Sequence, residues 1–244
     1  MSKLFAVRNA ASDPTRLGNS IVNFFAVEEG GRWTVLDAGL PAFWPQLEQN
    51  GIRPEAVEAV VLTHPHSDHV GVAERLRQHG ARVYVHEADR ELALDPEPIT
   101  GERSLLSYWR YPTAWRLKSR FARHGGSKLN PIAEVTTFTD GEQLDIPGRP
   151  RIIHTPGHTE GHSVLQLEDG TLLLGDLLCT WNPLTGKRGP QLIPAGLSKS
   201  SAQMLASLDS LEHLDAPTLL FGHGEAWYGG APAAVALARA TGPT

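Results

Sequence analysis

Cysteine is nearly absent from this sequence, since Cys179 is the only one among 244 residues. A single cysteine excludes an intramolecular disulfide framework and any CxxC metal or redox motif. Long apolar runs are also missing, and no stretch approaches the roughly 18 apolar residues of a membrane span. The apolar run within the N-terminal stretch MSKLFAVRNA is too short for a signal peptide. These absences predict a cytoplasmic protein that has no membrane partner.

Charge of one sign is not in large excess. The chain carries 22 Lys and Arg against 27 Asp and Glu, which gives a formal net charge of -5. A charge balance of this kind does not attract nucleic acid or an anionic membrane to the whole protein. We therefore expect a small-molecule substrate, no nucleic-acid partner, and a monomer or homodimer. The length suits one large domain over residues 1–244 with a sizeable core.

Histidine is the residue that stands out, with 11 copies. Three of them lie with an aspartate in the stretch HPHSDH, directly after an apolar run. His64 and His66 are two residues apart, so they project to the same side of an extended segment but about 200° apart on a helix. The pair is therefore typical of chelation from a strand end or loop, and it excludes a helical HExxH site.

Asp68 and His69 complete this cluster where the chain bends toward the next helix. Four ligand-type side chains are more than one catalytic zinc site needs, because such a site usually takes three protein ligands and keeps one position open. Two adjacent metal ions would use them all. A coincidental clustering of this composition is improbable, whereas a lone histidine after a strand is usually a packed or surface residue.

Later loops supply candidates to complete two sites. Nitrogen and carboxylate donors without thiolate favour Zn²⁺, with Fe or Mn as other options. His162, four residues after His158, is expected to support a metal ligand or to pack in the core. The candidates are His158 in TPGHTEGH, Asp176 in LLLGDLL and His223 in FGHG.

Apolar patterning predicts a mixed α/β chain. Residues 20–27 and 32–39 are expected to form a hairpin that turns at residues 29–31. Short Val-rich or alternating runs predict further strands, and helical spacing predicts the helices. The strands are expected within 57–64, 82–89, 133–139, 142–148, 150–155, 162–168, 171–178 and 217–224, and the helices within 42–52, 70–80, 201–214 and the Ala-rich C-terminal segment.

The character of the chain changes between about residues 96 and 131. Residues 103–128 contain seven Lys and Arg, no Asp or Glu, and five interleaved aromatic residues. We expect a helical insertion broken at Pro112. One interpretation is an amphipathic helix pair that packs its aromatic residues on the core, and another is a dimer contact. A third is a lid that shapes a pocket for an apolar or anionic substrate through Trp109, Trp115 and Arg110 or Arg116.

The sequence resembles the metallo-β-lactamase superfamily. HPHSDH matches the HxHxDH signature of that superfamily, and TPGHTEGH, LLLGD and FGHG follow in its order along nearly the whole chain. The likeness is greatest to the hydrolase branches, glyoxalase II and the quorum-quenching lactonases. It implies an α/β fold of the αββα sandwich type, made of two mixed sheets faced with helices, with a dinuclear metal site at one edge.

The resemblance also assigns roles to residues. It implies that a metal-bridging hydroxide attacks an ester, lactone or thioester carbonyl, or an amide such as a β-lactam. Asp68 would hold the hydroxide and carry a proton to the leaving group. Asp37 in VLDAG corresponds to a carboxylate that supports a ligating histidine. The implied ligands are His64, His66 and His158 on one ion, Asp68, His69 and His223 on the other, and Asp176 between them.

Two departures and two alternatives remain open. Cys179, which we expect to be buried and inert, stands where similar acyl-homoserine lactonases carry tyrosine, and no counterpart of the glyoxalase II glutathione-binding domain is evident. A mononuclear iron enzyme like the persulfide dioxygenases would need only the first set of ligands. The basic, aromatic insertion would also suit a nuclease. Trp181 and Trp227 are further candidates for lining a substrate pocket.

Overall fold

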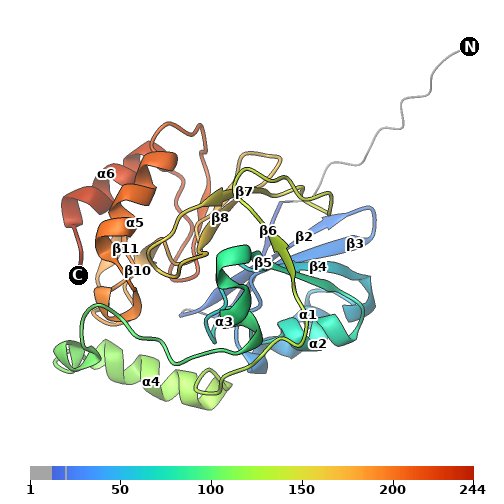
Figure 1. Cartoon of the computed structure of the whole chain (residues 1–244), viewed down its shortest axis with the longest axis horizontal. Helices are drawn as coiled ribbons and strands as arrows, with labels where there is room; N and C mark the ends of the chain where they lie inside the picture. Colours follow the sequence, from blue (N-terminus) through green and yellow to red (C-terminus); the bar gives the residue numbers. More distant parts are fainter. Residues whose placement is uncertain (1–12, 20) are drawn as a thin grey trace, which may run out of the picture.

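A computed structural model describes residues 13–19 and 21–244, and Figure 1 shows the chain. The N-terminal stretch 1–12, on which the expectation about a signal peptide falls, and Ser20 lie outside the described residues. Two sheets face each other in the middle of the molecule, and helices cover their outer faces. None of the helices in the described ranges is long and apolar enough to span a bilayer.

The first sheet has six strands in the order β1-β2-β3-β4-β5-β6. The first three pair antiparallel, and the pairs from β3 onward are parallel. The Val-rich sequences of β4 and β5 reflect burial on both faces, which is usual for parallel strands. The strands are β1 (Thr15–Gly18), β2 (Asn23–Glu29), β3 (Arg32–Leu36), β4 (Val57–Val61), β5 (Arg82–His86) and β6 (Thr136–Phe138).

The second sheet has four strands in the order β12-β9-β8-β7, and a separate hairpin pairs β10 with β11. Strands β9 and β12 run parallel, so their carboxyl ends lie at the same edge. The strands are β7 (Arg151–His154), β8 (Ser163–Gln166), β9 (Leu172–Leu173), β10 (Leu178–Trp181), β11 (Arg188–Leu192) and β12 (Leu219–Leu220).

Within residues 13–19 and 21–244, six α-helices and several 3-10 turns lie between or after these strands. The α-helices are α1 (Trp44–Gln49), α2 (Ala73–Gln78), α3 (Arg90–Leu94), α4 (Pro112–His124), α5 (Ser201–Ser207) and α6 (Ala231–Thr241). The 3-10 turns are η1 (Pro41–Phe43), η2 (Pro54–Ala56), η3 (Glu87–Asp89), η4 (Leu105–Tyr108), η5 (Ala195–Leu197) and η6 (Leu208–Ser210).

Three buried apolar clusters define four layers. Successive residues of a strand point to opposite faces of the sheet, so Phe24 packs toward α1 and α2 whereas Phe25 packs between the two sheets. The third cluster joins the outer face of the second sheet to α5 and α6, for example through Val164, Met204 and Val235. The predicted αββα sandwich is therefore confirmed.

Most of the predicted elements are present, and the differences are local. The strand expected at 142–148 is wrong, because Gln143 forms only an isolated bridge with Arg151. The helix expected to run to Leu214 ends at Ser207 and continues as a 3-10 turn. The strand expected at 171–178 is interrupted after Leu173, and strands β1, β10 and β11 and helix α3 were not predicted. Strands β1 and β11 each pair antiparallel with the adjacent strand of the chain, but neither has an alternating apolar pattern of its own.

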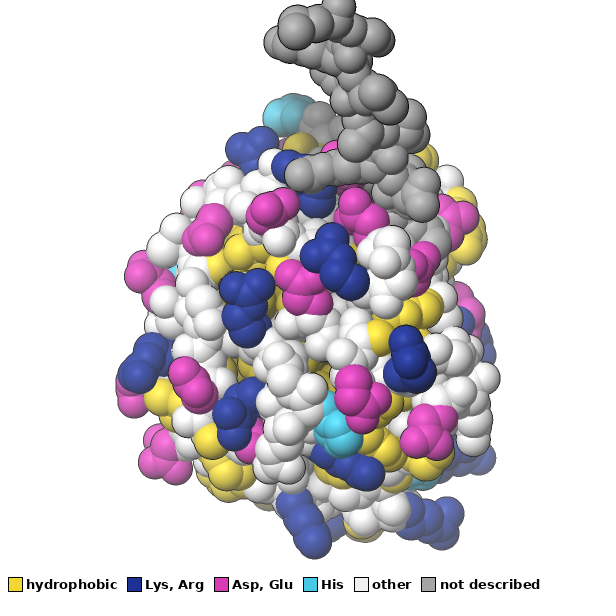
Figure 2. All heavy atoms as spheres, turned by 90° about the vertical axis from the view of Figure 1, so that its right-hand side faces the viewer, with side chains coloured by type: hydrophobic (Ala, Val, Ile, Leu, Met, Phe, Trp, Pro, Cys, Tyr) yellow, Lys and Arg dark blue, Asp and Glu magenta, His cyan; other side chains and the backbone are white. Residues whose placement is uncertain are grey.

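The surface carries mixed charge on the face at the right of Figure 1. Figure 2 shows Lys and Arg side chains interspersed with Asp and Glu on this face. A mixed surface of this kind produces no long-range field of one sign, in line with the near balance of charge in the sequence.

Candidate metal centre

Four loops bring the predicted ligands to one edge of the sandwich. The HPHSDH segment lies between β4 and α2, as the sequence predicted, and His158 lies between β7 and β8. Asp176 and His223 follow the parallel strands β9 and β12. A hydrogen bond from the Ser163 N–H to the Thr63 carbonyl, 2.9 Å long, joins the two sheets beside these loops. The site therefore depends on both sheets.

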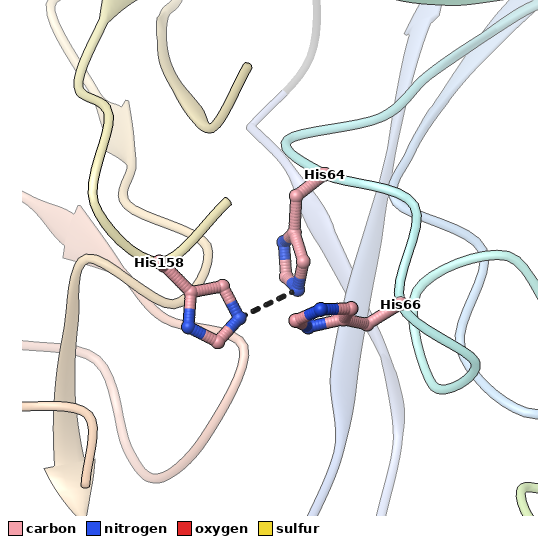
Figure 3. A group of neighbouring side chains, drawn as sticks. All are labelled: His64, His66 and His158. Carbon is pink, nitrogen blue, oxygen red and sulfur yellow. Dashed lines mark hydrogen bonds between the residues drawn. The ribbon is translucent and has the colours of Figure 1, made fainter. Parts of the chain in front are cut away.

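The structure brings all seven predicted residues together in one buried cluster. In each of three groups, the ligand-type atoms lie within 4.8 Å of one another. Figure 3 shows the first group, in which His64 and His66 point from one loop toward His158 from another. The Nε2 atoms of His64 and His158 are 3.1 Å apart. The groups are His64, His66 and His158; Asp68, His69 and His223; and His64, His69 and Asp176.

Asp176 lies between the first two groups. Its Oδ2 atom is 3.6 Å from His158 Nε2 and 3.3 Å from His223 Nε2. Its Oδ1 atom is 3.6 Å from His69 Nε2. This carboxylate can therefore reach donors of both groups, as a bridging ligand must.

The residues present fit divalent metal ions. His69 Nε2 and Asp176 Oδ1 are buried and have no hydrogen-bond partner among the described residues. A buried polar atom without a partner costs about 1–3 kcal/mol, and a metal ion between these atoms would remove that cost. Imidazole and carboxylate donors without thiolate suit Zn, Fe or Mn. The role of the seven residues as metal ligands stays a prediction, which this fit supports.

Burial keeps the first group in the neutral form that binds metal. Burial, reinforced by neighbouring imidazoles, holds the pKa of His64 and of His158 well below the usual 6.5. Burial also lowers the pKa of His66 to about 4, although Asp68 and Asp176 oppose the shift. A neutral imidazole offers its lone pair without first losing a proton. These three side chains are therefore ready to bind an ion at neutral pH.

The second group is held together by opposite charges. Burial disfavours the charged form of His69, but Asp37, Asp68 and Asp176 outweigh it and raise the pKa of His69 to about 9. The pKa of His223 is raised for the same reason, with burial again opposed by Asp176 and Asp68. In the metal-free protein, protons on these two rings therefore balance the carboxylates. Metal binding would displace those protons.

Asp37 orients His69, as the resemblance implied. Its Oδ2 atom accepts a hydrogen bond from His69 Nδ1–H over 2.9 Å, and its Oδ1 atom accepts one from the Thr63 N–H over 2.8 Å. The φ angle of Asp37 is 56°, in the left-handed region that aspartate tolerates better than most residues. This contact fixes the proton on Nδ1 and leaves His69 Nε2 free to face the cluster.

The other ring nitrogens are anchored by groups that the sequence did not reveal. His64 Nδ1 lies 3.1 Å from Thr63 Oγ1, and His158 Nδ1 lies 3.2 Å from Ser198 Oγ. His223 Nδ1–H donates to the Ile21 carbonyl over 2.5 Å. Thr63 has a local signal, because it directly precedes the HPHSDH segment. Ser198 has none, since it lies 40 residues from its partner.

The loop that carries His158 is held by Asp89, which the sequence analysis also missed. The buried Asp89 carboxylate accepts hydrogen bonds from Thr159 Oγ1 at 2.5 Å and from the Gly161 N–H at 2.9 Å. His162 lies outside the three donor groups, as expected. Its Nε2 atom accepts the Asp176 N–H over 3.1 Å, so the ring positions the candidate bridging residue.

Glycine is required at one point of the cluster. A Cβ atom on Gly222 would lie 2.6 Å from Asp176 Oδ1 and 2.7 Å from His69 Cε1. Real Cβ atoms do not approach other atoms so closely, so a side chain here would displace two candidate ligands. Glycine at position 222 therefore allows the backbone to approach the candidate ligands closely.

A cavity of about 730 Å³ opens onto the cluster and is covered by the insertion. Trp109 and Trp115 line it, whereas Arg110 and Arg116 do not. Trp181 and Trp227 are also absent from its lining, so their proposed role was wrong. Both pack against the hydrophobic core instead. Trp181 contacts the apolar core residues beneath α1 and α2, and Trp227 contacts those beneath α5 and α6.

The fold and this site define the class to which the protein belongs. The family model of the metallo-beta-lactamase superfamily matches residues 17–223. The chain therefore belongs to this superfamily, whose members are mostly metallo-hydrolases.

Several relatives are similar over most of the chain. An uncharacterized protein of Mycobacterium tuberculosis is 32% identical over 182 residues, which cover 73% of this chain and 72% of the relative. The probable metallo-hydrolase YflN of Bacillus subtilis is 26% identical, with 84% and 81% covered. A hydroxyacylglutathione hydrolase of Shewanella loihica is 28% identical, with 83% and 60% covered. The crystal structure of a metallo-beta-lactamase family protein from Thermus thermophilus superposes with a TM-score of 0.64 at 25% identity, covering 92% of this chain and 77% of that chain.

Proposed function

We propose that the protein is a dinuclear metal-dependent hydrolase that acts on the carbonyl of an ester, lactone or thioester. One observation carries this proposal: the Asp176 carboxylate lies within 3.6 Å of ring nitrogens from both donor groups. Two ions held side by side would need such a shared ligand. The ligand set would be His64, His66 and His158 for one ion, Asp68, His69 and His223 for the other, and Asp176 for both.

The bound ions would supply a hydroxide near neutral pH and polarise the carbonyl, because coordination lowers the pKa of water from 15.7 to about 7. Zn²⁺ suits the donors best. The protein's own part begins with the fixed ring orientations, which Asp37 and Ser198 hold from behind. Preorganised ligands of this kind need little rearrangement during the reaction.

Asp68 is the candidate for proton transfer. Its carboxylate lines the cavity and lies 3.4 Å from His223 Nε2 through Oδ2. Burial opposes ionisation of Asp68, but His69 and His223 outweigh it and lower its pKa. An ionised carboxylate at the base of the cavity can accept a proton from the attacking water and pass it to the leaving oxygen or sulfur.

Two features favour this function over the alternatives. The second donor group is complete, whereas a mononuclear iron oxygenase would need only the first. The cavity wall is apolar, and the arginines that would serve a nuclease, Arg110 and Arg116, do not line it. The name of the hydroxyacylglutathione hydrolase adds support for a thioester among the possible substrates.

Elemental mass spectrometry of the purified protein, combined with hydrolysis assays on lactones and thioesters, tests the proposal. We expect about two zinc or manganese ions per chain, and turnover that chelation abolishes and metal restores. The His223→Ala variant should lose one ion, whereas the matched variant of an exposed histidine, His213→Ala, should keep both. Retention of full activity in metal-stripped protein would overturn the proposal, as would about one iron per chain with oxygen uptake on a persulfide.

A further inference from the structure

The exposed apolar side chains gather at one place. Among the described residues, seven large hydrophobic side chains are exposed, and five of them line the cavity above the cluster. Apolar side chains concentrated on one surface usually mark a binding site, whereas single ones are common anywhere. The five are Leu105, Leu106, Trp109, Trp115 and Leu129.

The cavity connects these side chains to the candidate metal centre. Its base includes Asp68, Asp176 and His223, and its walls come from the insertion on one side and from Leu184 and Leu197 on the other. The volume of about 730 Å³ lies in the range of roughly 300–1,000 Å³ that is usual for small-molecule sites. A ligand can therefore place one end at the candidate metal ligands and extend along the inner side of α4, the helix at the lower edge of Figure 1.

The charges of the insertion mostly point elsewhere. Of its seven Lys and Arg, only Lys118 lines the cavity, and that side chain is exposed to solvent. Arg110 lies over the Tyr111 ring instead, with its guanidinium carbon 4.9 Å from the ring centre. Glu97 contributes an opposite charge to the cavity lining. The walls therefore select for an apolar group rather than for an anionic one.

We infer that the cavity binds the apolar acyl chain of the substrate, with the scissile carbonyl at the candidate metal ligands and the acyl chain between α4 and the η5 turn. The inference rests on the proposed function and names the substrate class: medium-chain acyl esters, lactones or thioesters. Continuity with the cluster favours a substrate over a membrane or a second copy of the chain, because neither would need a cavity that extends to Asp176 and His223.

Binding of the acyl products tests this directly without requiring turnover. Isothermal titration of the metal-loaded protein with butanoate, hexanoate, octanoate and decanoate keeps the carboxylate constant while the chain grows. Each added methylene should strengthen binding about twofold to fourfold until the cavity is filled, because it leaves water for an apolar wall. An affinity that does not change with chain length would overturn the inference. Chain-length dependence without hydrolysis would uphold the binding site for the acyl chain and count against the proposed function.

Substitutions in the cavity wall test where the bound acyl chain lies. Trp115→Ala should weaken decanoate binding about tenfold, because less apolar area is buried, and should leave butanoate binding unchanged. The matched control is Leu237→Ser, which changes an exposed side chain on α6 that does not line the cavity. If Trp115→Ala instead abolished binding to phosphatidylglycerol vesicles, or abolished dimerisation, and left the titrations unaltered, the wall would serve a membrane or a second copy, and the inference would fail.

Discussion

Replacement of Asp37 by asparagine is the sharpest test of how the candidate metal centre is built. The carboxylate uses both oxygens, Oδ1 for the Thr63 N–H at 2.8 Å and Oδ2 for His69 Nδ1–H at 2.9 Å. Asparagine has one acceptor oxygen and one NH₂ donor in the same shape. It also tolerates the φ angle of 56° at this position. The fold should therefore persist while one hydrogen bond fails.

Either orientation of the new amide is unfavourable. If the NH₂ group faces His69 Nδ1, the proton of the ring moves to Nε2, the atom that faces the cluster, and the lone pair for metal is lost. If it faces the Thr63 N–H, a buried donor loses its acceptor at a cost of about 1–3 kcal/mol. Loss of a partner behind a metal-binding histidine typically weakens metal affinity about 10–100-fold. This corresponds to about 1.4–2.7 kcal/mol.

Competition with a chromophoric chelator measures the effect. Asp37→Asn should bind zinc about 10–100-fold more weakly than the unaltered protein, with kcat/KM falling at limiting zinc. Asp145→Asn is the matched control, because Asp145 is exposed and lies outside the donor groups. Unchanged zinc affinity in Asp37→Asn would refute the argument that this carboxylate fixes the proton on His69.

Three further predictions concern other parts of the structure. Gly222→Ala would place a Cβ atom 2.6 Å from Asp176 Oδ1; we expect overpacking of about 1–3 kcal/mol and a lower metal content by elemental analysis, and a full complement of metal would contradict this. Burial, and to a smaller extent His154, lowers the pKa of His86 below the ordinary 6.5, so its contribution to stability is present above that pH and is lost as the pH falls. His86→Asn should therefore lose less stability than the unaltered protein between about pH 7 and pH 5 in urea titrations, and equal losses would count against it. Cys179 is buried, and burial raises the pKa of its thiol. A thiol reagent should therefore label Cys179 only after denaturation, and rapid labelling of the folded protein would contradict the burial of this side chain.

Local patterns in the sequence were enough to locate the candidate ligands. His64 and His66 lie two apart after a Val-rich run, and the structure places them in the loop after β4. The partners behind the ligands were harder to find, because Ser198 and Asp89 act across long separations in the chain. Strand β11 was missed for a different reason: it pairs with the adjacent strand β10, but its sequence RGPQL has no alternating apolar pattern.

The candidate metal ligands and the apolar residues of the insertion that line the cavity come from different segments of the chain. All seven candidate ligands come from loops at the edge of the two sheets, and no described residue between 96 and 131 belongs to a donor group. The insertion lines the wall and rim of the cavity and supplies none of the candidate ligands. Changes at Trp109 or Trp115 should therefore alter which acyl chain is preferred while metal affinity stays constant, whereas changes at Asp37 should alter metal affinity for every substrate alike.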